Sequence, residues 1–275
     1  MKNEVTIVID AHGHLHSCFG VCDFLERASS NLSKTVSRSV RGSRPTCVLF
    51  VLSTPEADGF NRLRRTVERG ADCGLGSRNW EAHVTAEPDS LCLMSDDCSL
   101  VTVAGRQMVS RERLEVLALG TRQQFKEGQP AQTLIQKVAQ AGAIPVLPWG
   151  VGKWMGARGR VVESLIESSA LPPFFLGDNA NRPAFWPPPS QFRRAEEQGI
   201  RNLSGSDPLP FPEEVQRVGS FGVVLNGALD LDRPAEDLKR MLLDPTTTFR
   251  QFGRRETPGR FVRNQLKMQY RKFTQ

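Results

Sequence analysis

Seven short apolar runs, separated by amphipathic stretches, constrain the fold of this chain more than any other feature. The runs lie at residues 6–10, 47–52, 115–120, 143–149, 173–178, 200–207 and 221–225. Each has the length and composition of a buried strand. Helical patterns lie between them at residues 131–141, 159–169, 191–198 and 235–243. Strands that alternate with helices of this length predict an α/β fold with a parallel sheet and helical crossovers.

The residues at the strand ends favour a barrel over an open sheet. Asp10, Trp149, Asp178 and Asp207 each close an apolar run and open a loop. An α/β barrel assembles its site from such carboxyl ends, contributed by strands across the whole chain. An open, doubly wound sheet more often has a glycine-rich phosphate turn after its first strand, and the sequence has neither GxGxxG nor GxxxxGK[ST]. We predict a distorted TIM-type barrel, with an open sheet as the alternative.

The composition fits one large domain, because 275 residues with 39% hydrophobic content can bury a substantial core. We expect the barrel over residues 1–245 and a basic tail over residues 246–275. Residues 80–106 have short alternating apolar runs, which predict inserted β-hairpins. Residues 29–46 are rich in Ser and Arg, which is typical of an exposed loop or a helix end.

The N-terminal apolar run and the cysteines bear on the compartment. The run is only about six residues long, too short for a signal peptide or a membrane span. The six cysteines form no CxxC pair, so we expect reduced and mostly buried thiols. Both features favour a cytoplasmic protein.

The net charge of +6 is concentrated near the end of the sequence. Residues 246–275 have eight Lys or Arg against the single Glu256, so this segment is +7 and the remainder −1. Such a tail is able to bind RNA, DNA or lipid headgroups. The alternative is a terminal helix that packs back on the domain or is simply solvated.

Three of the four histidines follow the first predicted strand, in the motif Asp10-Ala-His12-Gly-His14-Leu-His16. Alternate residues of a strand share a face, so His12 and His14 are able to present two imidazoles to one metal ion. Asp10 lies close enough to orient them or to act as a ligand. The alternative is that these imidazoles only make hydrogen bonds.

An Asp-x-His-x-His motif after a first strand resembles the opening motif of the polymerase and histidinol phosphatase (PHP) family of phosphoesterases, and of amidohydrolases. Residues 105–120 are similar to a PHP stretch in which a Gly-x-Glu precedes a strand with a histidine before Val-Leu-Ala-Leu-Gly. In this chain Gln107 replaces that glutamate and Glu115 replaces that histidine. The stretch favours the PHP family over the amidohydrolases.

Two later segments complete the resemblance, which covers residues 5–225. Pro148 and Trp149 stand where PHP proteins have a His-Pro ligand, and Leu209 replaces the last histidine of a closing Gly-Ser-Asp-x-His. The resemblance implies a PHP-like barrel that binds zinc, manganese or iron. It retains His12, His14 and Asp207 but loses several ligands of a three-metal site.

Two imidazoles and one carboxylate suffice for a single metal with an open position for water. Asp178 is the fourth candidate ligand, or else a loop carboxylate that caps the backbone and pairs with Arg182. The glycine-rich loop 149–160 suits phosphate and carries Lys153, although its cations can equally face solvent. Arg158, Arg160 and Arg182 are further cations that follow strand ends.

We therefore expect a metal-dependent phosphoesterase that uses a metal-activated water. Asp207 steers or deprotonates the water, and Lys153 or Arg182 offsets charge on the phosphoryl oxygens. The substrate is a phosphorylated small molecule or a nucleotide. The alternative is a catalytically degenerate PHP-like barrel that binds nucleic acid or protein.

Overall fold

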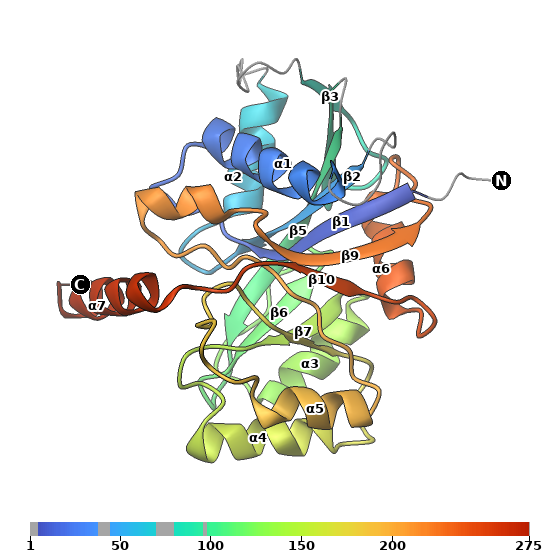
Figure 1. Cartoon of the computed structure of the whole chain (residues 1–275). Coiled ribbons are helices and arrows are strands. Elements are labelled where there is room, and N and C mark those ends of the chain that lie inside the picture. The colour runs from blue at the N-terminus through green and yellow to red at the C-terminus, as the bar shows by residue number, and fades with distance from the viewer. Residues whose placement is uncertain (1–4, 38–44, 70–79, 96–97, 275) are drawn as a thin grey trace.

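The computed structural model describes residues 5–37, 45–69, 80–95 and 98–274, which form a mixed α/β fold around a curled sheet (Figure 1). The main path of the sheet has the order β10-β9-β1-β2-β5-β6-β7-β8. The strands are β1 (Val5–Gly13), β2 (Thr46–Ser53), β3 (Glu81–His83), β4 (Ser90–Met94), β5 (Ser99–Val109), β6 (Glu115–Leu119), β7 (Ile144–Pro148), β8 (Phe175–Gly177), β9 (Phe221–Gly227) and β10 (Arg250–Gly253). The helices are α1 (Val21–Ser37), α2 (Gly59–Glu68), α3 (Ala131–Gln140), α4 (Gly156–Ile166), α5 (Ser190–Glu197), the short 3-10 helix η1 (Pro212–Arg217), α6 (Pro234–Leu243) and α7 (Pro258–Thr274).

The sheet is mixed, so the expectation of a parallel sheet is only partly met. Strands β1, β2 and β5 are parallel neighbours, as are β7 and β8. Strand β6 runs antiparallel to both β5 and β7, and β9 runs antiparallel to β1. Strands β5 and β6 are joined by a tight turn in which the Arg113 N–H donates to the carbonyl of Ser110 at 2.9 Å. A connection this short makes its two strands antiparallel.

An irregular segment, residues 201–207, joins the two sides of the curled sheet. On one side the Leu176 N–H donates to the Arg201 carbonyl at 3.1 Å, which ties the segment to β8. On the other side the Ala11 N–H donates to the Ser204 carbonyl at 3.2 Å, and the Asp207 N–H to the His12 carbonyl at 2.7 Å. The carboxyl end of β1 thus meets β8 through this segment, an arrangement consistent with a distorted barrel.

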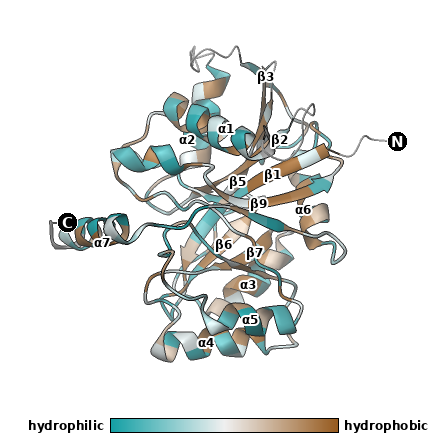
Figure 2. Cartoon of the chain, viewed as in Figure 1, coloured by the Kyte–Doolittle hydropathy of each residue, from teal (hydrophilic) through white to brown (hydrophobic). Residues whose placement is uncertain are grey.

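Three apolar cores account for the layers. The inner core gathers alternate residues of many strands, among them Ile7, Ile9, Val48, Phe50 and Val146. A second core lies between α1 and α2 and the outer face of β1 and β2, and a third lies between α3, α4 and α5 and β6 to β8. Figure 2 shows brown along β1 and much teal on the outer helices, as expected of helices that bury one face.

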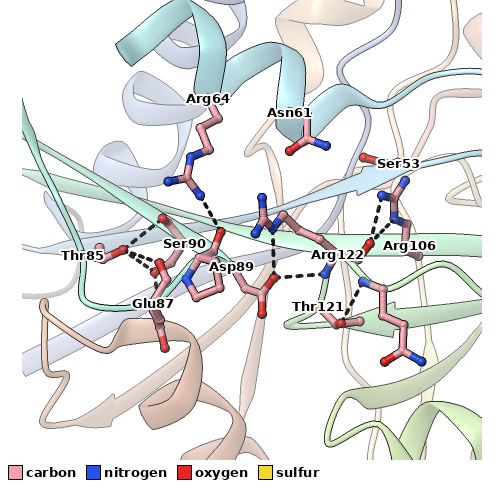
Figure 3. Close-up of polar contacts among 12 residues, drawn as sticks. Ser53, Asn61, Arg64, Thr85, Glu87, Asp89, Ser90, Arg106, Thr121 and Arg122 are labelled. Carbon is pink, nitrogen blue, oxygen red and sulfur yellow. Dashed lines mark hydrogen bonds and ion pairs between the residues drawn. The ribbon is translucent and has the colours of Figure 1, made fainter.

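The expected insertion in residues 80–106 is present as a β-hairpin. Strand β3 pairs antiparallel with β4, and β4 pairs antiparallel with β5. A polar network, drawn in Figure 3, joins the loop before β4 to the loop after β6. The backbone N–H and Nε of Arg122 donate to Asp89 Oδ1 at 3.1 and 3.3 Å, and Arg106 Nε donates to the Arg122 carbonyl at 3.0 Å. These arginines therefore serve to join loops.

The expected basic tail is part of the folded domain. Strand β10 pairs antiparallel with β9 and extends the sheet, and α7 follows and projects to one side (Figure 1). Of the 29–46 region, residues up to Ser37 belong to α1, and residues 38–44 lie outside the described part of the chain. No helix within the described ranges is long and apolar enough to span a bilayer.

The cysteines only partly meet the expectation of reduced thiols. Cys18, Cys47, Cys92 and Cys98 are not disulfide-bonded, and all but Cys18 are buried. Cys22 is disulfide-bonded, so the expectation is wrong at that position. Cys73 lies outside the described residues.

Candidate metal centre

The centre is built where β1 ends against the 201–207 segment. The register of β1 on β2 shifts between Asp10 and Gly13, where β1 has one residue more than its partner. Such a bulge changes the direction of the side chains that follow it. Asp207 has a φ of 47°, a left-handed conformation that is uncommon outside glycine and often marks a functional position. Both departures from regular backbone lie beside the histidines.

His12, His14 and Asp207 form a group of three potential metal ligands. His12 Nε2 and His14 Nε2 are 3.1 Å apart, and Asp207 Oδ1 lies 3.4 Å from the first and 3.9 Å from the second. Both histidines are buried, and the Asp207 side chain is 24% exposed. One ligand atom from each residue lies within 4.8 Å of the others.

The spacing of these atoms fits a divalent ion. Ligands at about 2.1 Å from a tetrahedral metal lie about 3.4 Å from one another. In addition, Gln107 Oε1 is 3.2 Å from His12 Nε2, so that three polar atoms converge on a single ring nitrogen. A ring nitrogen has either one N–H or one lone pair, so it makes only one good hydrogen bond. A cation bound between these atoms would interact favourably with several of them at once.

The pKa shifts of His14 and Asp207 also favour the protonation states that bind a cation. Burial lowers the pKa of His14 to about 3, and the neighbouring His12 adds to the effect. Burial by itself raises the pKa of Asp207, but His12, His14 and Lys153 outweigh it and hold that pKa below its usual value. Neutral imidazole and ionised carboxylate are the forms that bind metals.

Asp10 anchors the end of β1 instead of joining the three ligands. Its carboxylate accepts hydrogen bonds from the backbone N–H groups of His12, Ser206 and Gly219 at 3.0, 2.8 and 2.9 Å, and from the Ser206 hydroxyl at 2.5 Å. Burial raises the pKa of Asp10, and these hydrogen bonds oppose the shift. Of the two roles considered for Asp10, the structure favours the orienting one.

Two asparagines hold Asp207, and sequence reasoning did not assign them this role. Asn179 Nδ2 donates to Asp207 Oδ2 at 2.9 Å, and Asn181 Nδ2 donates to the Asp207 carbonyl at 2.5 Å. Both asparagines follow β8 and are buried. Their position directly after an apolar run that ends in Asp178 was the available signal.

Asp178 does not join the ligand group. Arg182 donates to its two oxygens at 2.8 and 2.7 Å, and Arg255 Nη2 donates to Oδ2 at 3.0 Å. Asp178 and Arg182 each have side chains only 1% exposed, so this is a buried ion pair inside the fold. Of the two roles expected for Asp178, the structure favours the ion pair with Arg182, and the group of potential ligands is His12, His14 and Asp207.

His14 and Asp207 open into a cavity of about 310 Å³. The same cavity is lined by Gln107, Glu115, Trp149 and Leu209, four positions at which the sequence departs from the PHP motifs that it resembles. Residues of α7 form another wall, namely Gln265, Met268 and Gln269. These three residues lie 58 to 62 positions from Asp207 in the sequence, and no local pattern indicated that they would border the site.

Of the four cations expected near the site, Lys153 alone lines the cavity. Its Nζ forms an ion pair with Glu115. Arg182 is buried against Asp178, and Arg158 donates to the Gly152 carbonyl at 2.9 Å. Arg160 is exposed on α4, outside the lining. His16 Nε2 lies 2.8 Å from the Pro208 carbonyl, so His16 fixes the loop after Asp207.

Comparisons with known proteins relate the chain to others through its fold. No family model matches the sequence, and no curated protein matches it. The crystal structure of PsfC from Pseudomonas syringae PB-5123 is similar with a TM-score of 0.54 and 15% identity, over 99% of this chain and 100% of PsfC. Endonuclease Q in complex with a 27-mer duplex containing an abasic lesion has a TM-score of 0.46 and 11% identity, over 87% of this chain and 56% of that one. PfuEndoQ from Pyrococcus furiosus has a TM-score of 0.46 and 10% identity, over 90% of this chain and 58% of that one.

The chain therefore spans little more than half the length of the two endonucleases. The match to PsfC extends over both chains from end to end. At this identity it relates the two chains by fold and says nothing of a shared reaction.

Proposed function

We propose that the chain is a metal-dependent phosphoesterase with a PHP-like barrel, in which His12, His14 and Asp207 hold one divalent ion. The observation that carries the proposal is the meeting of two imidazoles and a carboxylate at ligand spacing beside a cavity. The altered motif positions support the PHP resemblance, because residues 107, 115, 149 and 209 are far apart in the sequence and yet line the same cavity as His14 and Asp207.

The residues of the cavity would have the following roles in the reaction. A bound zinc, manganese or iron ion supplies a Lewis acid and a water of lowered pKa. Asp207 directs Oδ1 toward the histidines, while Asn179 holds its Oδ2. Lys153, fixed by Glu115, offers a positive charge for a phosphoryl oxygen. With Gln107 in place of a carboxylate, the site holds fewer metals than a three-metal centre.

The size of the cavity favours a small substrate. A volume of about 310 Å³ is at the lower end for ligand pockets. Among the described lining residues Lys153 is the one cation, which matches a single phosphate group. We therefore propose a phosphorylated small molecule or a nucleotide as the substrate class.

Metal content tests the ligand assignment directly. The protein, purified without a histidine tag and reconstituted with zinc, manganese or iron, should bind about one ion per chain by elemental analysis. The double variant His12→Ala, His14→Ala should bind none. His83→Ala is the matched control, because His83 lies on β3 and pairs with Asp232 at 2.8 Å, away from the site. If wild type holds no more metal than the double variant, the proposal fails and the degenerate binding barrel takes its place.

Activity tests the reaction class. Metal-loaded protein should release phosphate from members of a panel of phosphate esters and leave cyclic amides intact. Asp207→Asn should abolish this release. Cleavage of amides alone would contradict the phosphoesterase assignment, and phosphate release that persists in Asp207→Asn would belong to a contaminant.

A further inference from the structure

A second hollow, of about 750 Å³, lies between α1, η1 and the segment that runs from β10 into α7. In Figure 1 the red β10–α7 connection passes below the orange η1 helix, on the side from which α7 projects. We call it the basic hollow, because six cationic side chains line it against one carboxylate, Glu256. The cations are Lys34, Arg217, Arg250, Arg254, Arg255 and Arg260.

Buried carboxylates hold three of these arginines in place. Arg217 pairs with Glu256, Arg255 Nη2 lies 3.0 Å from Asp178 Oδ2, and Arg260 Nη2 lies 2.8 Å from Glu214 Oε1. The three carboxylate side chains are at most 4% exposed. The side chains of Arg255 and Arg260 remain 31% and 33% exposed. Guanidinium groups fixed in this way lose little conformational entropy when they bind a ligand.

Two other cations of the hollow, Lys34 and Arg254, add further positive charge. Lys34 and Arg254 are exposed, and within the described part of the chain neither makes an ion pair. Like charges gathered around a concave surface raise the local concentration of an oppositely charged ligand. The excess positive charge of the hollow therefore selects for an anion with more than one negative charge.

We propose that the basic hollow binds a ligand that contains a diphosphate group. Arginine forks match phosphate oxygens in geometry, and a diphosphate carries enough charge for several of them. The cations come from α1, η1, β10 and α7 and converge on one hollow, as expected of a site for a compact anion.

Two basic residues further along α7 make contacts within the fold, which favours a compact ligand over an extended one. Lys267 pairs with Glu213, and Arg271 Nη1 donates to the Pro210 carbonyl at 3.0 Å. These two cations of the basic tail therefore have partners within the fold. The basic hollow shares no lining residue with the cavity at His14 and Asp207, so the inference does not depend on the proposed catalytic function.

Calorimetric titration with inorganic pyrophosphate, in buffer containing a chelator, tests the proposal. Wild type should bind, and the double variant Lys34→Gln, Arg254→Gln should bind at least about tenfold more weakly, because each lost charge-assisted contact is strong. The matched control is Lys126→Gln, Arg160→Gln, which removes two exposed cations outside the hollow and should bind as wild type does. His12→Ala, His14→Ala should also bind as wild type does.

Absence of pyrophosphate binding, equal weakening in the control variant, or loss of binding in the histidine variant would each overturn the proposal. Titration with ADP separates two sources of the same group: tighter binding than pyrophosphate identifies a nucleoside diphosphate, and equal binding identifies the diphosphate alone. A short oligonucleotide that binds through Lys34 and Arg254 while pyrophosphate and ADP do not would assign the hollow to nucleic acid and contradict the inference.

Discussion

The side-chain amide of Asn179 donates one hydrogen bond to Asp207 Oδ2 and another to the Trp149 carbonyl, each of 2.9 Å. Both amide hydrogens are therefore used, and the group is fixed in one orientation. The contact joins the loop after β7, the loop after β8 and the proposed metal ligand. It leaves Asp207 Oδ1 directed at His12 and His14.

Asn179→Ala should weaken metal binding by about 10- to 100-fold, the usual effect of removing a group that orients a ligand. Metal titration followed by elemental analysis measures the change. Asn226→Ala, a change at an exposed asparagine near the other end of β1, should leave the affinity unchanged. Equal metal affinity in Asn179→Ala and wild type would contradict the orienting role.

Gly205 lies where the 201–207 segment contacts β1. A Cβ at this position would lie 2.2 Å from the backbone nitrogen of His12. Gly205→Ala should therefore push β1 and the segment apart, destabilise the fold by about 3 kcal/mol or more, and abolish metal binding. Gly259→Ala in α7, where a Cβ meets nothing within 4 Å, should be neutral or slightly stabilising. Urea unfolding compares the two, and equal stability would contradict the close approach.

Asp207 has a left-handed backbone conformation, so two substitutions can distinguish the effect of losing its carboxylate from the effect of backbone strain. Asp207→Gly and Asp207→Ala both remove the carboxylate, but glycine adopts a φ of 47° without strain. The alanine variant should be less stable than the glycine variant by about 1 kcal/mol. Neither variant should bind metal. An alanine variant as stable as the glycine variant would show that the backbone there relaxes.

Asp178 should make the stability of the fold depend on pH. Burial by itself raises its pKa, but Arg182 and Arg255 outweigh that effect and hold the pKa below its usual value. The folded state therefore binds fewer protons than the unfolded state, and the stability that Asp178 contributes is present above about pH 4 and is lost as the pH falls through the lowered pKa.

Urea unfolding of wild type and Asp178→Asn measures this contribution. At pH 7 the variant should be about 3–5 kcal/mol less stable, because Arg182 is left buried without its partner. The difference should shrink as the pH falls from about 4 through the lowered pKa, because the unfolded wild-type chain is protonated first and the folded carboxyl only at the lower pKa. A difference that does not change with pH would mean that the ion pair is not its source.

Several features of the fold follow from the sequence alone. The helices expected from periodicity at residues 131–141, 159–169, 191–198 and 235–243 are present as α3, α4, α5 and α6 within a few residues. The apolar runs are strands, apart from the irregular 201–207 segment. Local periodicity specifies these elements because each must bury one face. It also indicated His12 and His14, since alternate residues after a strand share a side.

The tertiary structure decided how these elements meet. No local sequence pattern shows whether Asp178 pairs with Arg182 or binds a metal, because both roles require a carboxylate directly after a strand. Likewise, Arg255 belongs to a tail for which the sequence left both nucleic-acid binding and packing on the domain open, and in the structure it reaches Asp178 from 77 positions away. The sequence by itself determined which side chains follow the strands and where positive charge accumulates. Only the folded chain determined which of those charges neutralise one another, because ion pairing depends on distances between segments that are remote in the sequence.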